Sequence, residues 1–266
     1  MPRYRPDEAI DPDTAVCPVV GLAIDSRKHE SGWHTHRRTQ LLYQAEGAVT
    51  LHTADRIGQL APSQAVWLPA GCLHRTTMHG RFSYRSLYFD VETYPDLPGS
   101  PAILEISALL RELILSVTGW SSDQALTPAQ HRLIATLLDE LAAAKSAPLH
   151  LPMPREKRLR TIAQALLDDP ALPLSLGDWG VQVGASERTL ARAFVRETGM
   201  TFSQWRTQCR LLIAQTRLAE GVSVTTVAHM VGYASDSAFI AMYRRTYGLP
   251  PSRRTRSRIR ISPKPE

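Results

Sequence analysis

The chain is 266 residues long, 43% of its residues are hydrophobic, and its formal net charge is +6 at pH 7. This length suits two domains that each bury a core. It contains no run of about 18 apolar residues that could span a membrane, and the first residues lack the apolar core of a signal peptide, so the composition argues against an integral membrane protein.

The charge is unevenly distributed along the chain. Residues 155–266 hold 18 Lys and Arg against 9 Asp and Glu, whereas residues 1–154 hold 13 against 16. The positive field belongs to the C-terminal part, as expected of a part that contacts phosphates. The three cysteines, Cys17, Cys72 and Cys209, have no paired spacing. We interpret them as reduced structural thiols and expect a cytoplasmic protein.

Short alternating apolar runs, separated by Gly and Pro, follow an irregular start over residues 1–16. Strands this short and regularly spaced predict a small β-barrel or sandwich. The expected strands are 19–24, 41–44, 48–53, 65–68 and 84–89.

Two histidines in this region have a spacing that can bring their rings together. His34 and His36 point to the same side if they lie on a strand, and a family resemblance implies that Gln40 and His74 complete a set of nitrogen and oxygen donors. Three interpretations stay open: a divalent metal site, a hydrogen-bonded pocket for an organic effector, and side chains that simply line the barrel. The other histidines of the region have no partner spacing and are interpreted as surface or strand residues: His29, His52 and His79.

The same segments resemble the two motifs of the cupin family. Gly32-Trp-His34-Thr-His36 up to Gln40, followed by Gly47, matches the first motif, and Pro69-Ala-Gly71-Cys-Leu-His74 matches the second. The resemblance implies a cupin-like barrel. It departs from metal-binding cupins at Gln40, where a carboxylate is usual, and a neutral amide is a weaker ligand. An iron oxygenase site with two histidines and one carboxylate is therefore not expected.

Two amphipathic helices are expected next, over residues 102–117 and from Pro128 to about residue 144, with Thr127 as the N-cap of the second. They cover the barrel or also contact a second copy, and their apolar content favours a homodimer. Residues 146–154 contain three prolines and predict the interdomain linker, followed by a helix over 155–167. The apolar stripes are Ile103, Ile106, Leu109, Leu110 and Leu113 in the first helix and Leu133, Leu137, Leu138 and Leu141 in the second.

The stretch 176–199 predicts two short helices joined by a tight turn. Gly184 interrupts the first helix, and Ser186 is a good N-cap for the second. Leu190 and Phe194 point into a core, while arginines recur every four residues on another face, at 188, 192 and 196. This layout is typical of a helix-turn-helix that reads DNA. On its own, it is equally typical of an amphipathic hairpin with a solvated charged face.

A second copy over residues 224–248 decides between these interpretations. Gly232 corresponds to Gly184 at an offset of 48, and four further positions correspond at an offset of 49, namely Ser235, Phe239, Tyr243 and Gly248. The second turn is therefore one residue longer. A helix over 202–219 joins the copies, so the two units can enter successive major grooves, about 34 Å apart on B-DNA.

Residues 156–255 resemble the DNA-binding domain of the AraC/XylS family of bacterial transcription regulators. The matching runs are 184–194 and 197–202 in the first copy, and Val227-Ala, Val231-Gly-Tyr, 235–239 and Tyr247-Gly-Leu-Pro-Pro in the second. Trp179-Gly180 departs from the family, which has an aliphatic residue followed by Ala there. Glycine costs about 1 kcal/mol of helix propensity, and we expect Trp179 to fill the space that it leaves.

The resemblance implies which residues touch DNA. Arg188, Ala191 and Arg192 would face base edges, where the arginine fork suits guanine. The second helix presents short side chains, so we expect the first copy to supply most of the specificity. The full set is Ser186, Glu187, Arg188, Thr189, Ala191, Arg192 and Arg196 in the first copy and Ser235, Asp236, Ser237, Ala238, Ala241, Arg244 and Arg245 in the second.

These expectations combine into an α+β chain of two domains. A cupin-like sensor barrel occupies residues 1–95, and the helical pair with its linker occupies 96–154. An AraC-type DNA-binding domain with two helix-turn-helix motifs, at about 176–197 and 224–246, occupies 155–255. A basic tail, 256–266, follows the domain. The arginines of 253–260 form either an arm that seeks phosphates or a solvated terminus.

The expected function is a ligand-responsive, sequence-specific transcriptional regulator, an activator or a repressor, with no catalytic residues. The alternative is a cupin-type metal-dependent enzyme with an attached DNA-binding domain. The expected partners are double-stranded promoter DNA, a small-molecule effector, RNA polymerase and a second copy of the chain, and no membrane. The one cofactor considered is a divalent metal at His34, His36, Gln40 and His74.

Overall fold

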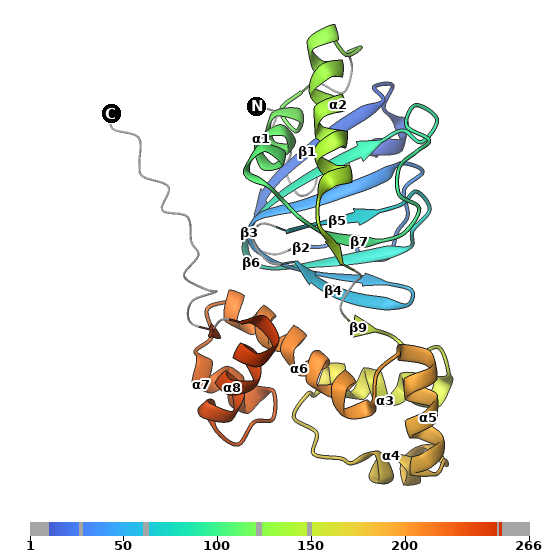
Figure 1. The fold of residues 1–266 in the computed structure, drawn as a ribbon, viewed down its shortest axis with the longest axis vertical. Coiled ribbons are helices and arrows are strands. Elements are labelled where there is room, and N and C mark those ends of the chain that lie inside the picture. The colour runs from blue at the N-terminus through green and yellow to red at the C-terminus, as the bar shows by residue number, and fades with distance from the viewer. Residues whose placement is uncertain are drawn as a thin grey trace. The chain divides into compact units, whose positions relative to one another are not determined.

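The computed structural model describes residues 11–26, 29–60, 64–120, 124–147, 151–248 and 250–251. It divides into two compact units between Met153 and Pro154. The first unit is rich in strands and carries two helices, and the second contains helices α3 to α8 (Figure 1). This is the expected α+β organisation. The basic tail and the arginines of 253–260 lie outside the described residues.

Two long antiparallel strands, β3 (Thr39–Thr53) and β6 (His74–Phe89), form the centre of the strand-rich unit. Register shifts around Glu46 interrupt their pairing, and Gly47 adopts a φ of +91° there, a conformation that favours glycine. The two halves of the pair therefore have different neighbours. One half extends through β1 (Val19–Ser26), β5 (Gln64–Leu68), β7 (Ala102–Glu105) and β8 (Ser146–Ala147), and the other through β2 (His29–Glu30), β4 (Arg56–Leu60) and β9 (Leu151–Pro152).

Of the two forms expected for this unit, a barrel or a sandwich, the strand pairing excludes a closed barrel. The described strands form two antiparallel sheets that share β3 and β6, and the pairing path is open at β1 and β8. Two strands predicted separately, 41–44 and 48–53, are parts of β3 that the irregularity divides. A bulge bends a strand and increases its twist, so one strand can serve both sheets.

Alternation along β3 divides the core of this unit into two layers. Leu41 and Tyr43 pack with residues of α1 (Ala108–Val117) and α2 (Pro128–Ala143). Leu42 and Val49 belong to the other layer, which both sheets supply. Successive side chains of a strand point to opposite faces, so one sheet is buried on both sides.

The first predicted helix is wrong over residues 102–105. These residues form β7, which pairs with β5 and β8, and Ile103 and Leu104 are buried in opposite core layers. Ser107 begins α1 by accepting the N–H of Leu110. The second helix is confirmed: Thr127 is its N-cap, with a complete capping box, and Pro128 is its first residue.

The helical unit consists of six helices in the described chain, and α6 contributes to the core on both of its sides. Trp205 and Phe194 are fully buried, with ring centroids 6.1 Å apart. Further along α6, Leu211 packs with Val227 and Phe239. The helices are α3 (Lys157–Asp168), α4 (Leu176–Val183), α5 (Glu187–Thr198), α6 (Phe202–Ala219), α7 (Val224–Met230) and α8 (Asp236–Tyr247).

The predicted repeat is confirmed down to the hydrogen bond that closes each turn. Ala185 N–H donates to Gly180 in the first copy, and Tyr233 N–H donates to Ala228 in the second, both at 2.9 Å. The left-handed glycines of the two turns have φ values of +68° and +78°. Serines cap both second helices, and the second turn has the expected extra residue.

Two general features of the sequence also have counterparts in the structure. No described helix is both long and apolar enough to cross a membrane. All three cysteines are free, and Cys17 and Cys209 are buried. Burial raises the pKa of the Cys209 thiol to about 12, so this thiol stays protonated and acts as a small apolar group.

The structure explains the glycine that departs from the family pattern. A Cβ atom on Gly180 would lie 2.5 Å from the carbonyl oxygen of Ala185, which is a backbone atom of the turn. The sequence indicated only a loss of helix propensity at this position. Gly180 instead allows the turn to lie directly against α4, and the neighbouring Trp179 is buried, with 4% of its surface exposed.

Gly180→Ala is therefore expected to lower the free energy of unfolding of the helical unit by about 1–3 kcal/mol, the usual cost of overpacking. This net loss includes the gain of about 1 kcal/mol in helix propensity. Denaturant titration of the full chain, followed by circular dichroism, measures it. Gly177→Ala is the matched control, because its Cβ would meet side-chain atoms and no backbone, the nearest being a carboxylate oxygen of Glu187 at 3.2 Å. A Gly180→Ala variant as stable as this control would contradict the explanation.

Candidate functional site

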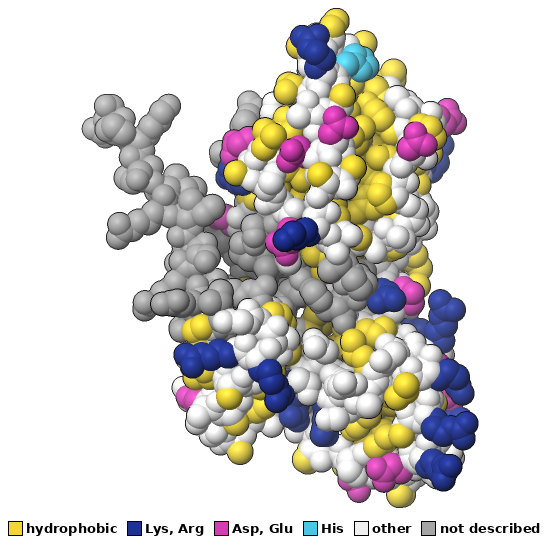
Figure 2. Space-filling view, viewed as in Figure 1, with side chains coloured by type: hydrophobic (Ala, Val, Ile, Leu, Met, Phe, Trp, Pro, Cys, Tyr) yellow, Lys and Arg dark blue, Asp and Glu magenta, His cyan; other side chains and the backbone are white. Residues whose placement is uncertain are grey.

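The residues predicted to contact DNA lie on the solvent side of α5 and α8. Apart from Ala191 and Asp236, which are half-buried, all of them are exposed. On the opposite side of α5, Leu190 and Phe194 are buried. Figure 2 shows Lys and Arg side chains gathered over the helical unit, as the uneven charge of the sequence predicts.

The three arginines on the exposed side of α5 differ in whether they form an ion pair. Arg196 forms an ion pair with Glu197, at 3.4 Å. Within the part of the chain that the structure describes, Arg188 and Arg192 form no ion pair. Both side chains are exposed, so their guanidinium groups are free to donate to phosphate or base acceptors.

The acidic residues at the start of α5 and α8 adjoin the preceding helix. Thr225 of α7 donates a short hydrogen bond to Asp236. In the first copy, Glu187 lies next to Gly177, the position that corresponds to Thr225. Carboxylates in the first turn of a helix also interact favourably with its dipole. Asp236 thus has a role inside its own motif.

Two arginines of α6, which the sequence analysis did not single out, hold the segment that leads into α4, and one of them also contacts the second motif. Arg206 donates to the carbonyl of Leu174 at 3.1 Å, and Arg210 donates to that of Pro170 at 2.9 Å. The guanidinium of Arg210 also lies 5.5 Å from the ring centroid of Tyr233, in the turn of the second motif. Arg210 therefore joins the segment that leads into α4 to the second turn.

The structure brings His34, His36 and His74 together in the strand-rich unit. Their ligand-capable nitrogen atoms lie within 4.8 Å of one another. The ring centroids are 4.8 Å apart for His34 and His36, 4.3 Å for His34 and His74, and 5.5 Å for His36 and His74. His74 is the first residue of β6 and pairs with His34 across an isolated antiparallel bridge.

Hydrogen bonds orient two of these rings. Nδ1 of His34 lies 3.1 Å from the carbonyl of Gly32, and Nδ1 of His74 lies 2.9 Å from that of Cys72. A carbonyl can only accept, so each Nδ1 carries a proton, and Nε2 is the nitrogen of each ring that is left to bind a ligand or an ion. Burial lowers the pKa of His74 to about 4, and burial followed by the charge of His34 lowers that of His36. Both are neutral imidazoles at neutral pH.

The cluster fits a metal ion by its donor atoms. Nε2 of His36 and Nε2 of His74 are buried and have no hydrogen-bond partner among the described residues. Buried polar atoms without a partner are rare in folded proteins and need an explanation. Lone pairs that face one another are satisfied by a shared cation or by a ligand that donates protons.

Gln40 belongs to a neighbouring network and not to the cluster of rings. Its buried amide nitrogen lies 2.9 Å from Tyr84 Oη, 2.9 Å from Ser86 Oγ and 3.0 Å from Tyr88 Oη. An amide has two protons, so two of these hydroxyls accept at a time. His36 adjoins the network through Tyr88, with ring centroids 5.0 Å apart.

Sequence reasoning missed the three hydroxyl residues, although a signal was present. Tyr84, Ser86 and Tyr88 alternate along a predicted strand, which places them on one face. In the register of β3 and β6, Gln40 lies opposite Tyr88. A strand face with three hydroxyl groups, opposite a glutamine of the first cupin-like motif, indicates a buried polar layer.

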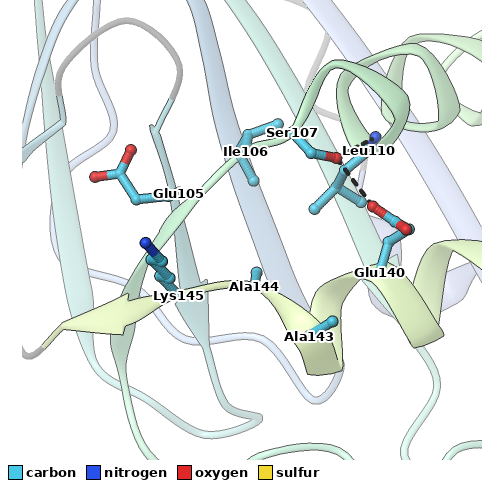
Figure 3. A pocket seen from close by; sticks show the side chains of 8 residues that line it. All are labelled: Glu105, Ile106, Ser107, Leu110, Glu140, Ala143, Ala144 and Lys145. Atoms are coloured by element: carbon cyan, nitrogen blue, oxygen red, sulfur yellow. Dashed lines mark hydrogen bonds between the residues drawn. The ribbon is translucent and has the colours of Figure 1, made fainter.

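A separate hollow of about 290 Å³ lies between β7 and the ends of α1 and α2 (Figure 3). Ser107 donates to Glu140 at one end of it. None of the residues predicted as a site lines it, so it carries none of the expected chemistry. Its lining residues are Glu105, Ile106, Ser107, Leu110, Glu140, Ala143, Ala144 and Lys145.

Two family models match the chain. One is described as an AraC-like ligand binding domain and matches residues 16–152, and the other is described as a helix-turn-helix domain and matches residues 179–257. The two matched ranges coincide closely with the strand-rich unit and with the double motif of the helical unit.

Two proteins named as transcriptional regulators are similar to this chain over different lengths. The HTH-type transcriptional regulator NimR of Escherichia coli K12 is 34% identical over 98% of this chain and 93% of its own. The HTH-type transcriptional regulator RipA of Corynebacterium glutamicum is 38% identical over 41% of this chain and 33% of its own. The solved structure of ToxT from Vibrio cholerae with an unsaturated fatty acid bound is 12% identical over 91% of this chain and 95% of that one. Its TM-score of 0.38 is too low to carry an argument.

Gln40→Leu is expected to destabilise the strand-rich unit, because it removes the buried amide that donates to the hydroxyl groups opposite it and puts an apolar side chain against them. Such a loss costs about 1–3 kcal/mol, measured by denaturant titration. Gln64→Leu is the matched control on β5, where the half-buried amide donates to an exposed carboxylate of Glu105, and a change within about 0.5 kcal/mol is expected. Equal losses of unfolding free energy in the two variants would contradict the prediction that the buried hydrogen bonds of Gln40 stabilise this unit.

Proposed function

The chain belongs to the AraC family of transcriptional regulators, and from this premise we propose that it reads two successive major grooves of promoter DNA under control of a ligand in its strand-rich unit. The family membership rests on both matching models and on the relative that is 34% identical over 98% of the chain. The observation that carries the proposal is the second helix-turn-helix, which repeats the turn hydrogen bond of the first.

A fixed spacing between the motifs supports the reading of two grooves. Major grooves on one face of B-DNA recur about every 34 Å, so two recognition helices engage them together only when their separation is constant. The shared helix α6 and the contacts of Arg210 with Pro170 and Tyr233 supply this rigidity.

The first copy is proposed to supply most of the base discrimination. Arg188 and Arg192 are long, exposed and without an ion pair among the described residues, whereas the exposed face of α8 begins with Ser235, Ser237 and Ala238. Short side chains reach fewer base edges, and Arg244 and Arg245 at the end of α8 suit phosphates, which position the protein.

The proposal also includes a second copy of the chain and RNA polymerase as partners. A second copy of the chain would use the helical pair, where Leu109 and Leu133 expose 51% and 38% of their surface. A contact with RNA polymerase and a cytoplasmic location follow from the role of a regulator. A catalytic role is not proposed, because the relatives are named regulators and position 40 holds an amide engaged with hydroxyl groups.

Arg192→Ala is expected to weaken discrimination between the preferred operator and a single-base variant by about 1–3 kcal/mol, the worth of one bidentate contact to guanine. Competition binding of the full chain to paired operators measures this. The double change Asp236→Ala, Ser237→Ala in α8 is expected to have the smaller effect. Thr225→Ala is its control, because it breaks the hydrogen bond to Asp236 and keeps the carboxylate. A larger loss from the α8 change would overturn the assignment.

Arg210→Ala is expected to broaden the dependence of binding on the distance between the two half-sites. In the wild-type chain, affinity should peak when the half-sites are about one helical turn apart, roughly 10 base pairs. A variant without the contacts of Arg210 should show a flatter profile, because the angle between the motifs is less fixed. Gel-shift titrations on operators with inserted base pairs measure the profile.

Arg217→Ala is the control for this experiment, since Arg217 lies on the same helix and forms a surface ion pair with Glu220, at 3.0 Å. Its spacing profile should match that of the wild type. An Arg210→Ala profile as sharp as the wild-type profile would mean that another contact fixes the separation of the motifs.

A further inference from the structure

We propose that His34, His36 and His74 bind one divalent transition-metal ion of the zinc class and leave its fourth coordination position open. The proposal deepens the ligand-dependent part of the proposed function and does not depend on how the helical unit reads DNA. It assigns the ion to the cluster of rings and leaves Gln40 outside it.

Backbone hydrogen bonds position the three histidines. His34 and His74 exchange both of their backbone hydrogen bonds, at 2.9 and 3.0 Å, and Gly71 N–H donates to His36 at 2.8 Å. The loop that bears two of the donors is thereby fixed to the start of β6, which bears the third. A site whose ligands are positioned in advance loses little conformational freedom on binding.

The side chains present the correct atoms to an ion. The carbonyl groups of Gly32 and Cys72 accept hydrogen bonds from Nδ1 of His34 and His74, an arrangement that fixes the ligating tautomer in metal sites. Nε2 of His36 and Nε2 of His74 are buried and have no partner in the described parts of the chain. An ion at the centre would satisfy all of these atoms at once.

The distances allow binding after a small closure. The ligand-capable nitrogens lie within 4.8 Å of one another, whereas nitrogens bound to zinc at about 2.1 Å in a tetrahedral arrangement are roughly 3.4 Å apart. Rotation of the rings about their side-chain bonds closes this difference, since the backbone already brings their centroids to between 4.3 and 5.5 Å.

The donor set selects the class of ion. Three imidazole nitrogens suit zinc, cobalt, nickel or copper, whereas calcium and magnesium require oxygen ligands. The group contains no carboxylate, so a bound ion keeps its double positive charge. Three protein ligands leave one position of a tetrahedral ion open, and this position suits water or an anionic donor of the effector.

The test is a titration of the purified, metal-free full chain with Co²⁺, followed by its visible absorption, and then displacement by Zn²⁺. We expect one Co²⁺ per chain with the intense bands of a tetrahedral site. His34→Ala and His74→Ala should abolish the bands. They should weaken Zn²⁺ binding by more than the roughly 10- to 100-fold that follows loss of a group which only orients a ligand.

His131→Ala is the matched control, because His131 is exposed on α2, and it should bind like the wild type. Circular dichroism checks that each variant is folded, and His34→Asn provides a smaller change if His34→Ala unfolds. A folded wild-type chain without stoichiometric Co²⁺, or bands that survive in a folded His74→Ala variant, would overturn the proposal. Operator binding measured on the same samples keeps a failure of metal binding distinct from a failure of the proposed DNA readout.

Discussion

The buried face of α6 is the constraint on which the function of the helical unit depends. Trp205 and Cys209 are fully buried toward α3 and α5, and Leu211 is fully buried toward α7 and α8. Because one continuous helix belongs to both cores, the two motifs cannot separate without exposing these side chains. Removal of a buried tryptophan alone costs about 3–5 kcal/mol, so the spacing of the recognition helices is part of the fold.

Sequence reasoning was most successful in the helical unit, where local patterns carry the information. Serine caps, left-handed glycines and a repeated apolar spacing define each motif independently of distant contacts. It was less successful in the strand-rich unit. Ile103, Leu104 and Ile106 fit a helical stripe as well as a buried strand, and β4 contains Gly58 and Gln59, which weaken its apolar alternation. Only pairing with distant strands decides such cases.

The candidate sites show the same difference between local patterns, which the sequence reveals, and contacts with distant residues, which it does not. The spacing of His34 and His36 predicted convergence, and the structure places His74 beside them. Gln40 was included by its place in the motif, but the hydroxyl groups opposite it, which engage its amide, come from a strand far along the chain. Arg206 and Arg210 resemble ordinary solvated helix arginines in the sequence. Their partners, the carbonyl groups of Leu174 and Pro170, offer no side-chain signal.

The length of β6 has a mechanical consequence. The strand begins at His74, inside the group of imidazoles, and ends at Phe89, beneath the helical pair. It pairs with β3 on both sides of the register shifts around Glu46. One continuous strand therefore joins the histidine cluster to the residues that pack under α1, so a displacement at one end of β6 can be passed to the helical pair through the sheet.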